Sequence, residues 1–161
     1  MSDWLQSWMD TVCEVMAVTD GNGQQVRSFY VFKINELPDA IKPDDIPCAY
    51  SYATSPEVQY SLGGPLILRW KGRTEFHLTR DVKPSNIPYI LPFFETIVRA
   101  CAAKMQLGGI AEIGLFTISQ NTPDALMFAT YKNAKGDDDH QGVVLNWELE
   151  QRIEGDLVVA Q

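Results

Sequence analysis

The sequence is poor in cysteine, histidine and positive charge, and each shortage narrows what the protein can be. Its three cysteines, Cys13, Cys48 and Cys101, are odd in number and widely spaced, which argues against a disulfide framework and favours a reducing compartment. The net charge of −8 disfavours a broad basic surface for nucleic acid. No stretch approaches the roughly 18 uninterrupted apolar residues of a membrane helix, and the acidic N-terminal segment does not resemble a signal peptide, so we expect no membrane partner.

The two histidines form no pattern of metal ligands. Neither His77 nor His140 has a cysteine or a second histidine at metal-ligand spacing. His77 alternates with charged residues, so we expect it on the surface. A nucleophile–histidine–acid triad of His77 with Cys48 or Cys101 is disfavoured, because Cys101 lies on an apolar helical stripe and Cys48 has no local signature. We therefore predict no catalytic residue, no metal site, no cofactor and no enzymatic activity.

Apolar residues at helical spacing predict two helices. The first covers residues 3 to about 18. The second has the longer apolar stripe, but Pro92 removes a helical hydrogen-bond donor from its middle. We therefore expect a short turn over residues 86–91, a main helix that starts at Pro92, and an end at Gly108-Gly109.

Strands are predicted for most of the remaining chain. β-branched and aromatic residues or period-2 alternation indicate extended segments at residues 26–34, 48–52, 58–62, 110–119, 125–132 and 142–154. Residues 66–79 resemble a hairpin whose turn is marked by Gly72. The segment at 142–154 alternates most regularly, which is typical of a strand with one side facing solvent or a partner. Polar residues 133–141 predict a mobile loop, and residues 156–161 a loose tail.

These elements predict one domain over residues 1–161. Many strands with only two helices favour an α+β fold, a mostly antiparallel sheet with two helices packed on one face. A chain of this length can bury a core without disulfides or metals.

One segment matches a calcium-binding pattern. Asp137, Asp139, Gly142 and Glu148 occupy the first, third, sixth and twelfth positions of an EF-hand loop. The flanking segments alternate as strands, however, whereas an EF-hand needs helices. An acidic hairpin tip is therefore favoured over a calcium site.

Two sets of residues are candidates for subunit contacts. Trp4 and Trp8 lie one helical turn apart and could dock on a neighbouring subunit, although core packing is favoured. Four basic residues crowd the predicted hairpin and could form either an interaction patch or a solvated face: Arg69, Lys71, Arg73 and Arg80.

The order and style of these segments resemble the tail terminator (tail completion) proteins of long-tailed bacteriophages. The resemblance extends over most of the chain and rests on the N-terminal helix and on four segments, at residues 37–52, 66–82, 87–109 and 142–155. It implies a non-enzymatic subunit of a ring, usually hexameric, in the neck of a virion assembled in the host cytoplasm. The implied partners are the tail tube protein below and the head–tail connector protein above.

A closed ring needs two unlike, complementary patches on each subunit. The basic residues at 69–80 and the acidic tip at 137–139 could meet in adjacent subunits. DNA would pass through the ring without specific binding, and an acidic lining would repel its phosphates. Asp137, Asp138 and Asp139 are candidates for that lining.

Two alternatives remain open from the sequence. The chain could be another neck or tail component, such as a head-completion protein or a tube protein that polymerises into filaments. It could also be a small-molecule-binding α+β domain, for which the evidence would be polar residues that converge in a pocket. A bound cofactor, or a cavity where titratable side chains converge on a substrate, would overturn the prediction of a purely structural role.

Overall fold

The computed structural model describes residues 3–19, 23–31, 37–38, 40–54, 56–59, 66–104, 113–119 and 124–153. Within these ranges the side chains are described except at residues 3–6, 113–116 and 153. Two α-helices and seven strands occur in the described part, which confirms the predicted α+β class. The elements in chain order are α1 (Asp3–Met16), β1 (Arg27–Tyr30), β2 (Cys48–Ala53), β3 (Glu57–Gln59), β4 (Leu66–His77), α2 (Ile87–Ala103), β5 (Ile113–Ile118), β6 (Leu126–Lys132) and β7 (Asp138–Ile153).

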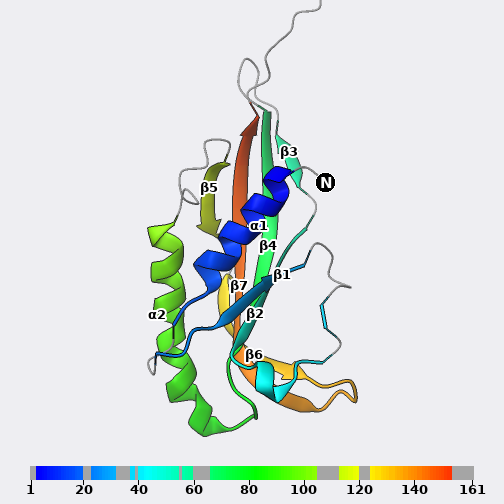
Figure 1. The fold of residues 1–161 in the computed structure, drawn as a ribbon, viewed down its shortest axis with the longest axis vertical. Coiled ribbons are helices and arrows are strands. Elements are labelled where there is room, and N and C mark those ends of the chain that lie inside the picture. The colour runs from blue at the N-terminus through cyan, green and yellow to red at the C-terminus, as the bar shows by residue number, and fades with distance from the viewer. Residues whose placement is uncertain are drawn as a thin grey trace, which may run out of the picture.

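Two long antiparallel strands, β4 and β7, form the spine of the sheet (Figure 1). On the outer side of β4 lie β2 and β3, and on the outer side of β7 lie β5 and β6, all antiparallel to the spine. Strand β1 extends the sheet beyond β2 in parallel. The predicted mostly antiparallel sheet is confirmed, including the strand near residues 48–52, which became β2.

The register of the strands sorts their side chains onto two faces. Ala49, Phe76 and Val143 lie in one row across β2, β4 and β7, and they contact the helices. We call this side the helix face. The adjacent row, Cys48, His77 and Gly142, belongs to the opposite side, the back face.

Both helices cover the helix face, as predicted. Buried α1 residues (Trp8, Val12, Val15, Met16) and α2 residues (Ile90, Phe93, Ile97, Cys101) share one apolar core with the sheet residues Phe76, Val143, Leu145, Trp147 and Leu149. Helix α1 crosses in front of the spine in Figure 1, and α2 runs along one side of it. The alternation predicted for 142–154 is confirmed for Val143, Leu145, Trp147 and Leu149, which lie in this core.

The predicted hairpin at 66–79 is wrong. Residues 66–77 form the single strand β4, and Gly72 lies in its middle, opposite Trp147 of β7. A Cβ atom on Gly72 would come within 2.2 Å of the Trp147 ring. Glycine is therefore needed here for space rather than for a turn.

The predicted break at Pro92 is also wrong. Helix α2 is continuous from Ile87 to Ala103 with Pro92 inside it, after a short 3-10 turn at Pro84–Asn86. Because Pro92 lies only in the second helical turn, it removes one hydrogen bond close to the helix start. The predicted helix end at Gly108-Gly109 lies outside the described residues.

The predicted loop at 133–141 is shorter than expected. Strand β7 begins at Asp138, so residues 133–137 alone connect β6 to β7. Gly136 has a φ of 84°, which a non-glycine residue adopts only with strain. Residues 138–141 are therefore strand residues, and their side chains have fixed places on the sheet. The predicted tail at 156–161 lies outside the described residues.

Candidate functional site

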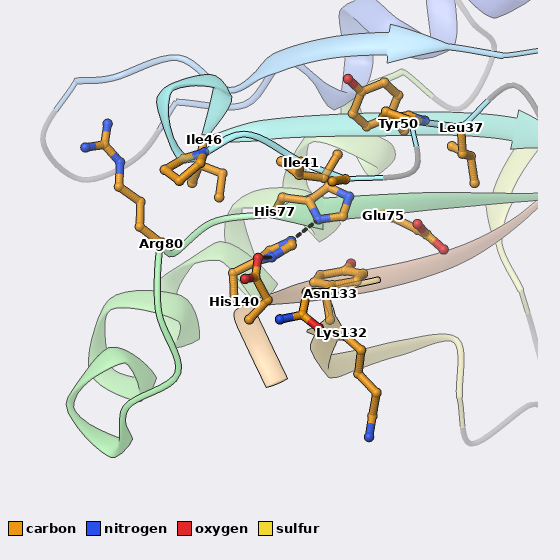
Figure 2. Close-up of a pocket in the computed structure, with 15 residues that line it drawn as sticks. Leu37, Ile41, Ile46, Tyr50, Glu75, His77, Arg80, Lys132, Asn133 and His140 are labelled. Carbon is orange, nitrogen blue, oxygen red and sulfur yellow. Dashed lines mark hydrogen bonds and ion pairs between the residues drawn. The ribbon is translucent and has the colours of Figure 1, made fainter. Parts of the chain in front are cut away.

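The back face carries a cavity of about 290 Å3 at the end of the spine where β4 finishes and β7 begins. Aromatic and titratable side chains line it on the sheet side: Tyr50, Glu75, His77, Tyr131 and His140. Apolar residues of the segment before β2 line the other side: Leu37, Pro38, Ala40, Ile41, Pro43 and Ile46. Figure 2 shows these two walls, with His77 and His140 directed toward one another from adjacent strands.

The two histidines form a hydrogen-bonded pair inside this cavity. His77 Nδ1 lies 2.6 Å from His140 Nε2, and the side chains are only 4% and 3% exposed. The prediction of a surface histidine at position 77 is therefore wrong. The polar pattern of β4 placed His77 correctly on the face opposite the core, but that face is covered here by the segment before β2 and by Tyr131.

Asp139 extends the pair into a chain of three side chains. Its Oδ2 atom lies 2.9 Å from His140 Nδ1, and its carboxylate is partly exposed. A carboxylate only accepts hydrogen bonds, so His140 donates through Nδ1. With both rings neutral, His140 Nε2 must then accept, and His77 must donate from Nδ1.

Aromatic rings hold the histidine pair in place. Tyr131 lies against both imidazoles, with ring centroids 4.1 Å from His77 and 4.9 Å from His140. Tyr50 meets His77 edge-on at 6.1 Å and stacks on Phe29 of β1. Burial and the nearby His140 lower the pKa of His77 to about 3, and burial raises the pKa of Tyr131 well above its usual value. His77 is therefore uncharged near neutral pH.

Charged groups surround the cavity, and most already have a partner. Glu75 lies 3.6 Å from Arg73 and accepts a hydrogen bond from Tyr52. Lys132 lies 3.8 Å from Asp138. Arg80 also lines the cavity and is exposed, with no ion pair to any described residue. The charges at the rim are thus mixed in sign, and the interior is mainly aromatic and apolar.

Cys48 lies directly across from His77 in the β2–β4 register, so the structure brings together two residues of the disfavoured triad. Burial raises the pKa of Cys48 to about 11, with Asp45 adding to the shift, which keeps the thiol protonated and weakly nucleophilic. Cys101 belongs to the core beneath α2, on the other side of the sheet, and burial raises its pKa to about 12. Neither thiol has the environment of an activated nucleophile.

The basic residues of β4 prove to be paired within the chain. Arg69 lies 3.8 Å from Glu150, Lys71 lies 3.1 Å from Glu57, and Arg73 lies near Glu75. They share the back face, whereas Arg80 lies beyond the strand. The positive charge that motivated a contact with an acidic neighbour is therefore largely balanced by the chain itself.

The remaining candidates fall in different places. Trp8 is buried in the core and meets Trp70 edge-on at 6.1 Å, so core packing, the favoured option, is confirmed for it. The side chain of Trp4 lies outside the described ones. Asp137 is exposed in the turn between β6 and β7, while Asp138 and Asp139 begin β7.

The acidic segment at 137–148 is a strand end, as favoured over a calcium loop. Asp137 and Glu148 are separated by eleven residue steps, most of them in the extended strand β7, so they lie on the order of 35 Å apart. Residues so far apart cannot coordinate one ion. Among the described residues no group of three or more metal-ligating side chains could hold a metal.

A second surface feature went unnoticed in the sequence. Leu91 and Val98 of α2 are 51% and 42% exposed, and Phe128 of β6 is 47% exposed. Phe94 joins them, because its ring lies 4.8 Å from that of Phe128. We call these four residues the apolar ridge. The apolar stripe of α2 is therefore wider than the side of the helix that is buried in the core.

Searches of protein-family models and of curated proteins found no match for this chain. None of the described helices has the length and apolarity to cross a membrane. The resemblance to tail terminator proteins therefore stays a prediction that rests on the order of the sequence segments.

Proposed function

We propose that this protein is a structural subunit that assembles head to tail into a ring, in the manner of the tail terminator proteins that its sequence resembles. In that role the ring, hexameric in the family, would cap a tail tube and join it to a head connector. The observation that carries the proposal is an apolar ridge at one edge of the sheet and exposed edge strands at the other.

The first of these surfaces is the apolar ridge. It lies on α2 and on β6, which is an edge strand beyond β7. Contiguous exposed apolar side chains on a chain of this size commonly mark a contact with another protein. Glu95 and Arg99 form an ion pair farther around the same helix, so a polar rim borders the ridge.

The second surface lies at the other edge. Phe29 of β1 is 44% exposed on the back face, and Val58 of the short edge strand β3 is 49% exposed on the helix face. The edge strands themselves, rather than one apolar patch, therefore form this surface. Exposed edge strands pair readily with other chains. Two different surfaces on opposite sides are what a head-to-tail ring requires, whereas a two-fold dimer needs only one self-complementary surface.

Charge takes a smaller part in this proposal than the sequence suggested. Because Arg69, Lys71 and Arg73 are balanced within the chain, apolar contact supports assembly better than pairing of these residues with the tip at 137–139. The lining of a DNA channel by Asp137, Asp138 and Asp139 remains a proposal that rests on their charge and on the exposure of the tip.

The test is native mass spectrometry of the full chain, followed by electron microscopy of any oligomer. We expect one closed ring size for the wild type. Val98→Glu should raise the dissociation constant of the ring by at least about tenfold, because a charge would be buried in an apolar contact. Ala103→Glu is the matched control: it adds the same charge at an exposed position of α2, about 140° around the helix.

Three outcomes would count against the proposal. A wild type that stays monomeric would exclude self-assembly. Long filaments would indicate a tube protein instead. Equal dissociation of the Val98→Glu and Ala103→Glu variants would show that the ridge is not the contact.

A further inference from the structure

The cavity on the back face has a feature that assembly does not require, a histidine ring nitrogen that lines it and makes no hydrogen bond to a described residue. His77 uses Nδ1 in its bond to His140, and Nε2 has no hydrogen-bond partner among the described residues. Figure 2 shows this second ring nitrogen on the far side of the ring from His140. Since His77 is 4% exposed and lines the cavity, a partner for Nε2 would have to come from within the cavity.

The chain of three side chains fixes which kind of partner this atom can take. The carboxylate of Asp139 makes His140 a donor at Nδ1, and in the uncharged form of this ring Nε2 is the acceptor. His77 therefore donates from Nδ1, and its Nε2 atom keeps a lone pair. A ligand that donates a hydrogen bond there satisfies this acceptor, with the modest net gain of an ordinary hydrogen bond.

The walls of the cavity indicate the shape of such a ligand. Tyr50, Tyr131 and the two imidazoles form an aromatic floor, and the segment that contains Leu37, Ile41 and Ile46 forms an apolar wall opposite. Aromatic side chains favour stacked or edge-to-face contact with another ring. The volume of about 290 Å3 is at the lower end for small-molecule sites, which limits the ligand to one or two rings.

We propose that this cavity binds a small planar ring compound that donates an O–H or N–H hydrogen bond to Nε2 of His77. Asp139 acts as the positioning residue that sets the tautomer of both histidines. Four charged groups lie at the rim of the cavity: Glu75, Arg80, Lys132 and Asp139. They can contact polar substituents on the outward edge of the ligand's ring. The apolar ridge includes no residue that lines the cavity, and Phe29 at the other edge meets the cavity only through its contact with Tyr50.

Phenol and anisole are the probes, since they share a ring and anisole lacks the donor. Titrations of the isotopically labelled full chain, followed by NMR, should show phenol bound about fivefold more tightly, the value of one net hydrogen bond. The shifted resonances should belong to residues that line the cavity. Long-range proton–nitrogen spectra should show Nε2 of His77 unprotonated in the free protein.

Asp139→Asn tests the positioning role. An amide can either donate to or accept from His140, so the tautomer is no longer fixed and the preference for phenol over anisole should shrink toward unity. Asp137→Asn makes the same chemical change at an exposed residue that does not line the cavity, and it should leave the preference unchanged.

The proposal is overturned by equal affinity for the two probes or by shifts that map outside the cavity. It is overturned also if neither probe saturates, or if His77 proves to carry its proton on Nε2. A monomeric protein that binds phenol more tightly than anisole would refute ring assembly and support the ligand site. A ring-forming protein that binds both probes equally would support assembly and refute the ligand site.

Discussion

The two faces of the sheet are covered in different ways. On the helix face, apolar side chains of β4 and β7 meet two amphipathic helices, and the result is a core that includes Phe76, Leu145 and Trp147 with no exposed surface. On the back face, the strands present charged, aromatic and imidazole side chains. One end of that face is nevertheless covered, so His77 and His140 are almost as buried as the core.

The difference teaches that alternation along a strand reports the face of a side chain but not its exposure. The polar face of β4 carries balanced ion pairs along Arg69, Lys71 and Arg73, where it meets solvent. At the end of β4 that contains His77, the segment with Ile41 and Ile46 covers the same face. A buried polar group needs a partner, and the histidine pair with Asp139 supplies it.

The largest expected effect comes from adding one methyl group at the glycines of the spine. A Cβ on Gly142 would lie 1.7 Å from the backbone oxygen of Phe76, and one on Gly72 would lie 2.2 Å from the ring of Trp147. We expect Gly142→Ala to destabilise by at least about 3 kcal/mol, because backbone must move, and Gly72→Ala by about 1–3 kcal/mol, because a ring must move.

Chemical denaturation of the two variants measures this difference. Gly136→Ala is the control, since its Cβ would meet nothing within 4 Å and its positive φ alone should cost about 1 kcal/mol. Equal losses for all three variants would show that backbone conformation, rather than close packing on both sides of the sheet, governs these positions.

The second prediction concerns the pH dependence of stability, to which the buried His77 of the back face contributes and the apolar core of the helix face does not. The folded pKa of His77 is about 3 and its ordinary value is 6.5, so between these pH values the unfolded chain binds a proton that the folded chain does not. Stability should therefore fall as the pH drops from 6.5 toward 3, by up to about 1.4 kcal/mol for each pH unit from this group.

Denaturation of the wild type and of His77→Gln across this range isolates the effect. Glu75, Asp139 and His140 are present in both proteins, so the difference between the two pH profiles reports mainly on the ring at position 77. At neutral pH we expect a lower free energy of unfolding for His77→Gln than for the wild type. On acidification the free energy of unfolding should fall less in the variant than in the wild type. Parallel pH profiles would mean that the His77 ring is far better hydrated than its burial implies.

Much of the fold could be predicted from the sequence, because its signals are local. The period of 3.6 in α1 and the period of 2 in β7 each identified an element and its buried side. The hairpin turn predicted at Gly72 was wrong because a glycine needed for turn geometry and a glycine needed for space look alike in a sequence. The expectation at Pro92 was wrong because α2 continues through this proline, although the residue removes one backbone hydrogen bond.

The cavity could not be predicted, since it depends on pairing between segments far apart in the chain. His77 and His140 come from β4 and β7, and only the register brings their rings together. One signal was present: Val143, Val144 and Leu145 are apolar in succession, so alternation fails there. All three are buried, and Val144 lies on the back face. A break in alternation was thus the sign that both faces are covered at this end of the strand.

The smallest expected effect concerns a polar cluster on the otherwise apolar helix face. Thr74 Oγ1 lies 2.8 Å from Ser51 Oγ and accepts a hydrogen bond from Trp147 Nε1 at 3.0 Å, and all three residues are fully buried. Thr74→Val keeps the shape of the side chain but removes the shared oxygen. We expect a loss of about 1–2 kcal/mol in the free energy of unfolding, because Ser51 and Trp147 both lose this partner.

A double-mutant cycle decides whether the three groups act as a unit. Adding Ser51→Ala to Thr74→Val should cost less than the two single changes together, since the hydroxyl of Ser51 is then no longer buried without that partner. Thr130→Val on β6 makes the same replacement at an exposed threonine and should change stability by less than about 0.5 kcal/mol. Strict additivity would mean that this cluster, unlike the histidine pair behind it, is incidental to the stability of its face.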